Sequence, residues 1–375
     1  MKILLDPQIY NAQKYGGISR YYTAIFSILS IKKELRIIVP LNNATNIYFN
    51  QSSLVNIKQK IYSSYVFTLK SLSLISQLKP EKVKNKHVKN IITAQDYDLF
   101  VATYYDSYFV KYIGTKPFVL TVYDMIHELF PEYFINEKKV VSNKRFLMQQ
   151  ATRIIAVSEN TKKDIVKIYP DIDESKIDVV YHGCSIKSNV KEVGFLPKKY
   201  ILFVGNRAIY KNFFFLVNSV AELLKNDSNL FLICAGGGDF NFIEKELLTK
   251  LGVEKQIVQM YFEENELAEF YKKAICFVFP SQYEGFGIPI LEAMTCGCPV
   301  VLANHSSFPE VAGIAGFYYE LNNSYDLRNK IYSLIENETL RNEYSLKGFE
   351  QVKKFSWEKA ARECLAVYKK ACIVK

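Results

Sequence analysis

Short runs of consecutive apolar residues recur along the whole chain at intervals of roughly 20–40 residues, separated by stretches with helical apolar spacing. In the first half these runs are KILLDP (2–7), LRIIVP (35–40), DLFVATYY (98–105), PFVLTVYD (117–124), TRIIAVS (152–158) and IDVVYHG (177–183). In the second half they are YILFVG (200–205), LFLICAG (230–236), IVQMYF (257–262), ICFVFPS (275–281) and PVVLAN (299–304). Such runs, without polar alternation, are typical of strands covered on both faces, and the helices between them predict parallel sheets.

Two successive sets of strands predict an α/β protein with two doubly wound domains. The predicted connection is the polar, Pro- and Gly-containing segment 187–199. We therefore expect an N-terminal domain over residues 1–190, a second domain over 191–355, and an amphipathic helix over 356–375 that packs back on the first domain. Ligands bind beyond the carboxyl ends of strands in open parallel sheets, so two facing domains would form a cleft between those ends.

The composition fits this picture, because 375 residues suffice for two domains and 49% of them are hydrophobic. No apolar run approaches the roughly 20 residues of a membrane span, and the start of the chain resembles a buried strand more than a signal peptide. The chain has seven Cys without a CxxC pair or Cys/His spacing typical of zinc sites, which argues against disulfides and a structural metal. We expect a cytoplasmic protein without a metal or cofactor.

The net charge of +10 is uneven along the chain. Residues 1–190 contain 26 Lys and Arg against 16 Asp and Glu, whereas residues 191–375 contain 22 of each class. Segment 58–89 alone has eight Lys and one Glu. Two interpretations stay open: a solvated surface, or peripheral contact with the anionic inner face of a membrane, worth about 1 kcal/mol per basic residue. Nucleic-acid binding is disfavoured because no recognition module accompanies the charge.

The most specific segment is SQYEGFGIPILEAMTCGCPVV (281–301). After a predicted strand it turns at Glu284 and two glycines and begins a helix with Pro289 in the first turn, where a missing N–H is tolerated. Glu292 is expected in the same first turn, and Gly297 fits the C-cap. Free N–H groups at the helix start suit phosphate or sugar hydroxyls, and the two carboxylates can accept hydrogen bonds at two points along one ligand. The structural alternative is an ordinary strand-turn-helix whose glutamates are a cap and a surface charge.

The pattern E-G-F-G-I-P-I-L-E in this segment resembles the donor-site signature of retaining glycosyltransferases of family 4. Members of that family have the GT-B fold, two facing Rossmann-like domains with a cleft between them. Four further segments match the family in the same order, so the resemblance covers essentially the whole chain: YGGISRY (15–21), VYDMIHELFPEYF (122–134), IIAVSENTKKDI (154–165) and VGNRAIYKN (204–212). The first and last of these segments resemble those of mannosyltransferases of surface-polysaccharide and O-antigen assembly.

In the second domain the resemblance implies a donor site. Arg207 and Lys211 match the basic pair that binds the donor diphosphate, and fixed cations suit a leaving diphosphate if no metal is present. The alternative for this pair is two surface cations at a helix start. Glu284 matches the carboxylate near the donor sugar, and Glu292 matches the residue that binds the ribose hydroxyls. The resemblance places further donor contacts on Gly285, Phe286, Gly287 and Ile288.

In the first domain Gly16 and Gly17 match the glycine-rich loop that closes over the donor phosphate. Many relatives place a His immediately before Asp124, whereas this chain has Tyr123. His127 is the candidate to contact the acceptor or the primary hydroxyl of the sugar instead, unless it is only a packed loop histidine. Asp124 either takes part in catalysis or orients the loop. The catalytic residues expected from the resemblance are Glu284, Arg207, Lys211, His127 and Asp124.

The sequence Gly236-Gly237-Gly238-Asp239 follows a predicted strand but lacks the full G-x-G-x-x-G register, which disfavours a dinucleotide cofactor. We expect this loop to face the nucleotide base of the donor.

The resemblance implies a retaining, metal-independent hexosyltransferase whose donor is a nucleotide sugar, with GDP-mannose favoured and UDP or dTDP sugars open. Its acceptor would be a glycan hydroxyl, on a free or lipid-linked glycan. Two other classes stay open: a GT-B sugar-nucleotide epimerase, and a non-catalytic nucleotide-sugar or membrane-surface binding protein. The intact signature disfavours the epimerase, and Tyr123 is the feature that favours the non-catalytic protein.

Overall fold

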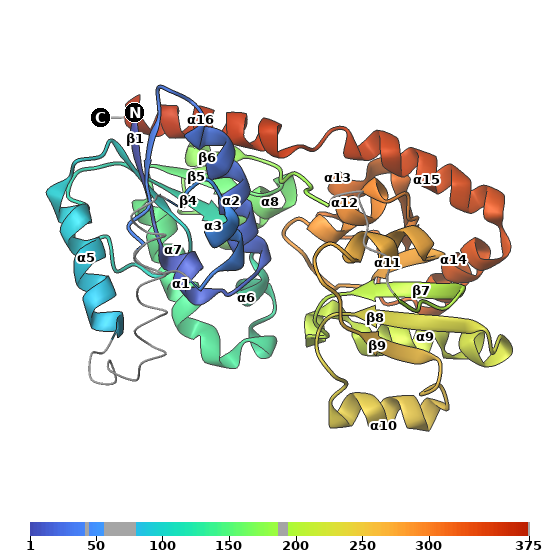
Figure 1. Ribbon diagram of the computed structural model, residues 1–375. Helices are drawn as coiled ribbons and strands as arrows, with labels where there is room; N and C mark the ends of the chain where they lie inside the picture. Colours follow the sequence, from blue (N-terminus) through green and yellow to red (C-terminus); the bar gives the residue numbers. More distant parts are fainter. Residues whose placement is uncertain (42–44, 56–79, 187–193, 374–375) are drawn as a thin grey trace, which may run out of the picture. The chain divides into compact units, whose positions relative to one another are not determined.

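The computed structural model describes residues 1–41, 45–55, 80–186 and 194–373 (Figure 1). Its chain divides into two compact units. Unit 1 comprises Met1–Val157, Thr161–His182 and Trp357–Lys375, and unit 2 comprises Ser158–Asn160 and Gly183–Ser356. Most of the connection predicted at 187–199 and residues 58–79 of the Lys-rich segment lie outside the described residues.

Unit 1 is built on a six-stranded parallel sheet with the order β2-β1-β3-β4-β5-β6. Its strands are β1 (Lys2–Leu5), β2 (Arg36–Ile38), β3 (Leu99–Ala102), β4 (Phe118–Val122), β5 (Arg153–Ala156) and β6 (Ile177–Val179). The α-helices that accompany them are α1 (Gln8–Ala12), α2 (Gly17–Ser30), α3 (Ile47–Gln51), α5 (Pro80–Ala94), α6 (Ile126–Leu129), α7 (Lys138–Gln150), α8 (Glu159–Ile168) and α16 (Trp357–Ile373). Short 3₁₀ turns lie at η1 (Pro131–Tyr133), η2 (Ile135–Glu137) and η3 (Glu174–Lys176).

Unit 2 has a second six-stranded parallel sheet, with the order β12-β11-β10-β7-β8-β9. Its strands are β7 (Lys199–Val204), β8 (Leu230–Ala235), β9 (Ile257–Met260), β10 (Cys276–Phe279), β11 (Val300–Ala303) and β12 (Gly316–Tyr319). The helices are η4 (Ile209–Lys211), α9 (Phe213–Asn226), α10 (Phe242–Leu251), α11 (Leu267–Lys273), α12 (Ile288–Thr295), α13 (Phe308–Ala312), η5 (Gly313–Ala315), α14 (Ser324–Glu336) and α15 (Glu338–Val352).

Each of the eleven predicted runs contains a strand, and the expected α/β fold with two doubly wound sheets is confirmed. Every residue of β3, β4, β10 and β11 is buried, as continuous apolar runs covered on both faces predict. One strand, β12, was not predicted. It is a short edge strand that begins with Gly316 and has two half-buried residues at its centre.

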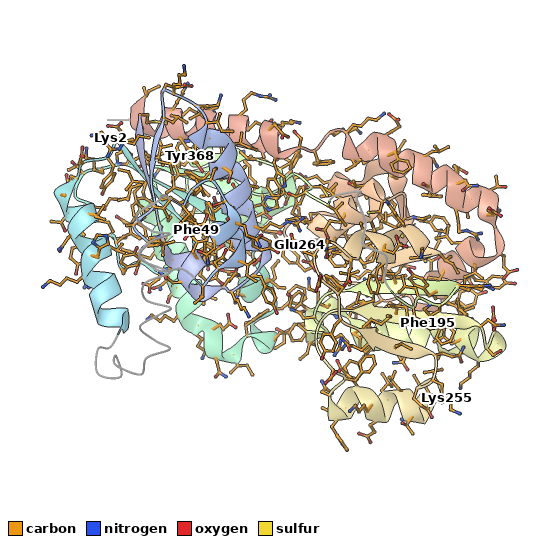
Figure 2. All side chains as sticks on the ribbon, viewed as in Figure 1. Lys2, Phe49, Phe195, Lys255, Glu264 and Tyr368 are labelled. Atoms are coloured by element: carbon orange, nitrogen blue, oxygen red, sulfur yellow. The ribbon has the colours of Figure 1, made fainter. Side chains whose placement is uncertain are left out.

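The predicted C-terminal helix is α16, which belongs to unit 1 and packs along α2 and against β5 (Figure 1). Its Tyr368, labelled in Figure 2, stacks on Phe26 of α2 with ring centroids 6.0 Å apart. The hydroxyl of Tyr21 lies 3.3 Å from the sulfur of Cys364, also on α16. Residues from opposite ends of the chain therefore form one core.

In unit 2 the chain passes from β7 outward to β8 and β9, and then from β10 outward in the other direction to β11 and β12. Because β7 and β10 are neighbours, the connections that follow them leave the sheet toward opposite edges. This is the topological switch point of the sheet, at which open α/β sheets bind their ligands.

His182 is a buried histidine of unit 1 whose protonation should make stability depend on pH. Its ring packs edge-to-face on Tyr21 and lies near Trp357, and burial lowers its pKa to about 3. Below pH 6.5 the unfolded chain takes up a proton that the folded chain does not, so stability falls by about 1.4 kcal/mol per pH unit as the pH drops toward 3. The His182→Gln variant should lack this contribution.

Urea unfolding followed by fluorescence checks this expectation, because Trp357 is the single tryptophan of the chain and adjoins His182. Burial raises the pKa of Asp6 to about 6, which gives the opposite pH dependence, but this contribution is common to both proteins and cancels in the comparison. The stability difference between wild type and His182→Gln should change by about 2 kcal/mol between pH 7.5 and pH 5. A difference that is the same at both pH values would contradict the buried, neutral histidine.

Candidate active site

The Glu284 turn lies at the carboxyl end of β10, at the switch point of unit 2. Gly287 has φ +98° and is the N-cap of α12, and a Cβ there would lie 2.9 Å from the Cδ1 of Ile290. Pro289 occupies the first turn, as predicted. Glu292 does not: it is the fifth residue of α12 and lies in the second turn, because the helix already begins at Ile288. The turn thus places its backbone N–H groups at the helix start, with Glu284 before the helix and Glu292 within it.

Lys211 and Glu284 are brought together at the switch point, although they are 73 residues apart in sequence. The Nζ of Lys211, at the end of η4 after β7, lies 2.5 Å from the Oε1 of Glu284. Each side chain is 16% exposed, so the pair is largely shielded but open to solvent on one side. A backbone hydrogen bond of 2.8 Å from Gln282 N to the oxygen of Tyr210 joins the two turns. A partly dehydrated ammonium and a carboxylate therefore share one small site.

Two serines that the sequence did not single out hold the Glu284 turn. Ser306 donates from its hydroxyl to the carbonyl of Glu284 at 2.7 Å, and Ser307 donates to the carbonyls of Glu284 at 2.9 Å and Phe286 at 3.0 Å. Ser306 adopts a left-handed conformation with φ +58°, which is unusual for a residue other than Gly. The two serines follow β11, the neighbour of β10, so a loop at the end of one strand holds the turn at the end of the next. A Ser-Ser dipeptide in a loop has no pattern by which this role could be predicted.

Arg207 lies in a different place from Lys211: it is directed at the loop that follows β8. Its Nε donates to the Oε1 of Glu244 at 2.8 Å, and the two side chains are 4% and 2% exposed. Its Nη2 donates to the carbonyls of Gly238 at 2.8 Å and Asp239 at 2.9 Å. The guanidinium also lies 4.7 Å from the ring centroid of Phe240. The expected basic pair is thus separated into one cation beside Glu284 and one cation bound to the glycine loop.

Phe286 and Glu292, both expected at the donor, are mostly buried. Phe286 is 4% exposed and packs edge-to-face with Phe355 at 5.9 Å, so its backbone is the part that can reach a ligand. Glu292 is also 4% exposed, and its Oε2 accepts a hydrogen bond from the hydroxyl of Tyr271 at 3.4 Å. Burial, together with the charge of Glu292, holds the pKa of Tyr271 well above its usual value. Tyr271 is therefore a neutral donor to this carboxylate.

The glycine-rich segment of unit 1 forms the start of α2. Gly16 is the N-cap of this helix and Gly17 its first residue. The hydroxyl of Ser19 donates to the carbonyl of Gly16 at 3.0 Å, and the side-chain oxygen of Gln13 accepts from the Ser19 N–H at 3.3 Å. Tyr15, just before the glycines, is 68% exposed. This segment presents backbone and an exposed aromatic ring to solvent.

His127 is held by Glu137, a partner that the sequence did not reveal. The Nε2 of His127 lies 2.8 Å from the Oε2 of Glu137, and its ring packs on Phe134 with centroids 4.4 Å apart. Within the described part of the chain, the buried Nδ1 of His127 has no hydrogen-bond partner. Asp124 uses its Oδ1 to accept from the N–H of Ile126 at 3.1 Å, so it shapes the start of α6.

Tyr123, which stands where many relatives have His, is part of the core of unit 1. It is 8% exposed, and its hydroxyl donates to the carbonyl of Thr103 at 3.2 Å. The segment that follows is anchored by the buried pair of Lys144 and Glu128, with 2.7 Å between Nζ and Oε2. The same Nζ donates to the carbonyl of Asp124 at 3.1 Å. Lys144 therefore holds both ends of the segment that contains His127.

Among the described residues, no three His, Cys, Asp or Glu side chains are grouped so that they could hold a metal ion. None of the helices there is both long and apolar enough to cross a bilayer.

Known proteins resemble this chain in sequence and in fold. Residues 185–351 match the family model described as glycosyl transferases group 1, and residues 65–187 match the model described as glycosyltransferase family 4. The chain is 28% identical over 270 residues to O-antigen chain mannosyltransferase B of Escherichia coli, covering 67% of this chain and 70% of that protein. It is also 28% identical over 204 residues to O-antigen chain mannosyltransferase RfbU of Salmonella typhimurium, covering 53% and 55% of the two chains.

Among solved structures, the fold is similar to that of Anabaena Alr3699/HepE in complex with UDP and glucose, with a TM-score of 0.72 over 98% of each chain at 18% identity. The two family models together span residues 65–351, and the two parallel sheets are those of the GT-B architecture. The chain therefore belongs to the family 4 glycosyltransferases and is a glycosyltransferase with the GT-B fold.

Proposed function

We propose that this glycosyltransferase transfers mannose from GDP-mannose to a hydroxyl of a glycan acceptor, with retention of configuration and without a metal ion, in surface-polysaccharide assembly. The observation that carries the proposal is the Lys211–Glu284 pair at the switch point of unit 2. Mannose is favoured because two of the similar proteins are O-antigen mannosyltransferases. A UDP-hexose is the second candidate, because the similar solved structure holds UDP and glucose.

Each side chain of the pair has a chemical task in this proposal. Breaking the bond between the anomeric carbon and the phosphate leaves negative charge on the diphosphate, which the ammonium of Lys211 stabilises. The N–H groups at the start of α12 give the phosphates further donors. The anomeric carbon gains positive charge at the same time, and the carboxylate of Glu284 stabilises it while accepting a hydrogen bond from a sugar hydroxyl.

Retention follows if the acceptor attacks from the face that the diphosphate leaves. The bond between the anomeric carbon and the acceptor oxygen forms as the bond to the phosphate oxygen breaks, and the acceptor proton moves to the departing phosphate. No side chain forms a covalent intermediate on this route. Glu284, whose Oε1 is already bound to Lys211, then acts through its charge.

In this proposal the residues expected in unit 1 contact the donor phosphate, the sugar or the acceptor. Gly16 and Gly17 offer backbone N–H groups at the start of α2 for the donor phosphate. His127 is oriented by Glu137, and it is the side chain of unit 1 that the family resemblance assigns to a sugar or acceptor hydroxyl. Asp124 shapes the turn that presents His127.

A thermal-shift panel of GDP, UDP, dTDP and their sugars tests the donor. A ligand that binds only the folded protein adds about 2.7 kcal/mol of stability at 100 times its Kd, which raises Tm measurably. GDP and GDP-mannose should raise Tm, and the other nucleotides should not. A shift with UDP alone would move the assignment to a UDP-hexose. If no nucleotide shifts Tm, the proposed function is wrong. Product analysis without an acceptor separates an epimerase, which converts its nucleotide sugar unaided.

A lipid-linked acceptor would bring unit 1 near an anionic membrane, and the Lys-rich segment 58–89 suits that contact. Co-sedimentation with vesicles should then depend on anionic lipid and weaken when these lysines are replaced by Gln. Equal recovery on neutral and anionic vesicles would leave the lysines as solvated surface.

A further inference from the structure

We propose that Arg207 and Glu244 form a positioning pair that fixes the loop of residues 236–239 beside the donor site, and that Arg207 does not itself bind the donor diphosphate. This inference rests on the proposed function, because it assigns the loop to donor binding. It separates the roles of two cations that the family resemblance groups together: Lys211 acts on the leaving group and Arg207 acts through the loop.

Four of the N–H donors of Arg207 are already used. An arginine side chain has five N–H donors. The Nε–H is bound to Glu244, both hydrogens of Nη2 are directed at the carbonyls of Gly238 and Asp239, and Nη1 lies 3.4 Å from the carbonyl of Gly236. With its side chain 4% exposed, the guanidinium would have to leave these partners to reach a diphosphate.

Glu244 extends the connection from Arg207 into α10. Its Oε1 accepts from Arg207, and its Oε2 accepts from the backbone N–H of Asn241 at 2.7 Å. The side chain of Asn241 in turn accepts from the N–H of Glu244 at 2.9 Å, which completes a capping box at the start of the helix. One buried carboxylate thus binds the arginine that holds the loop and the helix that follows the loop.

The loop needs such a clamp because it has almost no side chains to pack. Gly236, Gly237 and Gly238 have φ values of +80°, +76° and +77°, which other residues rarely adopt. A Cβ on Gly237 would lie 2.5 Å from the carbonyl oxygen of Gly205 and 2.9 Å from the Nη1 of Arg207. The loop therefore lies directly against the turn after β7.

That contact connects the loop to the proposed site. The turn after β7 begins at Gly205 and runs through Arg207 to Lys211, whose Nζ is bound to Glu284. The loop follows β8, the neighbour of β7, so its backbone borders the carboxyl edge where the donor would lie. The loop touches the nucleoside part of the donor in this proposal, whereas Lys211 touches the phosphates. Loss of the pair should then weaken donor binding and leave the chemical step nearly unchanged.

The test compares Arg207→Met, Glu244→Gln and the double variant Arg207→Met/Glu244→Leu. In Glu244→Gln the side chain keeps one acceptor oxygen instead of two, so it cannot accept from both Arg207 and Asn241, and the charge is lost, but no group that could touch a diphosphate changes. We expect each single variant to weaken the binding of UDP or GDP, whichever the wild type binds, by about tenfold in calorimetry. The double variant should be no weaker than the weaker single variant, because groups that act as a unit are not additive.

Steady-state donor hydrolysis or transfer gives the second measurement. KM for the nucleotide sugar should rise about tenfold in these variants while kcat stays within about threefold, a split that marks lost binding and not lost catalysis. Gly237→Ala keeps both charges but displaces the loop from Arg207, and it should show the same split. The matched control is Arg328→Met/Glu222→Gln, which removes an ion pair of unit 2 that is more exposed, and it should leave both constants unchanged.

Two results would overturn the proposal. One is wild-type nucleotide affinity in Glu244→Gln together with a tenfold loss of affinity in Arg207→Met. Arg207 would then bind the phosphates directly, because its contribution would not depend on the pairing with Glu244. The other is a fall in kcat of a hundredfold or more in Arg207→Met with little change in KM. If a single variant leaves a buried charge and does not fold, the double variant and Gly237→Ala carry the test.

Hydrogen exchange separates failure of this proposal from failure of the proposed function. Amides of residues 236–241 should exchange at least tenfold faster in the variants, with the strands of unit 2 unchanged, whether or not a nucleotide binds. A wild type that binds neither UDP nor GDP would contradict the proposed function. Unchanged exchange in the loop would contradict the positioning role itself.

Discussion

The Lys211→Met variant is expected to lower kcat for sugar transfer by about 10²–10³-fold, the usual effect of removing one group that stabilises charge in a transition state. The ammonium lies at the switch point of unit 2 and is 16% exposed, so its charge acts in surroundings with little water. Methionine is unbranched and only one atom shorter than lysine, so it keeps most of the side chain and removes the ammonium group. Initial rates with the donor identified by the nucleotide panel give the measurement.

Lys250→Met is the control, because Lys250 is an exposed cation on α10 of the same unit. It should transfer at the wild-type rate. Glu284→Gln removes the other half of the pair and should also lose most transfer, while circular dichroism and Tm stay close to wild type because both side chains keep access to solvent. Wild-type turnover in both Lys211→Met and Glu284→Gln would show that the donor site lies elsewhere.

The Lys144→Met variant should be strongly destabilised. The Lys144 side chain is fully buried, and that of Glu128 is 3% exposed. Removing the lysine leaves a buried carboxylate without its cation, which destabilises a protein by about 3–5 kcal/mol. The same substitution removes the hydrogen bond to the carbonyl of Asp124. Urea unfolding, followed through the fluorescence of Trp357, measures the loss.

The double variant Lys144→Met/Glu128→Leu distinguishes the charge from the packing. Apolar side chains of similar volume often replace a buried ion pair without a net loss, so the double variant should recover most of the stability. Its transfer activity should remain below wild type, because the segment with His127 loses an anchor. If the double variant were as unstable as Lys144→Met, lost packing and not the unpaired charge would be the cause.

The strands were predictable because a strand buried on both faces appears in the sequence as a run of consecutive apolar residues. The run PVVLAN (299–304), for example, contains β11, in which every residue is buried. Strand β12 has no such apolar run. It is an edge strand with fewer neighbours, and its sequence GFYY includes a glycine and two half-buried rings. Pro289 correctly indicated the start of α12, but the helix begins at Ile288, which is too early for Glu292 to fall in its first turn.

Long-range partners were not predictable in the same way. Nothing local to Lys211 indicates Glu284 as its partner, because that contact depends on the sheet order that makes β7 and β10 neighbours. Arg207 illustrates the same limit, since its partner Glu244 follows a different strand. A local signal did exist there: the N-x-x-E spacing of Asn241 and Glu244 is that of a capping box, which announces a helix start though not the arginine.

The division of unit 1 between both ends of the chain has a consequence for biosynthesis. The ribosome releases unit 2 complete before α16, whose buried Trp357, Cys364 and Tyr368 belong to the core of unit 1. Until then the apolar face of α2 has no partner from α16, and such surfaces favour aggregation and chaperone binding. Unit 2 should therefore reach its native fold on the nascent chain first, and the N-terminal residues, though made earliest, should become protease-resistant last.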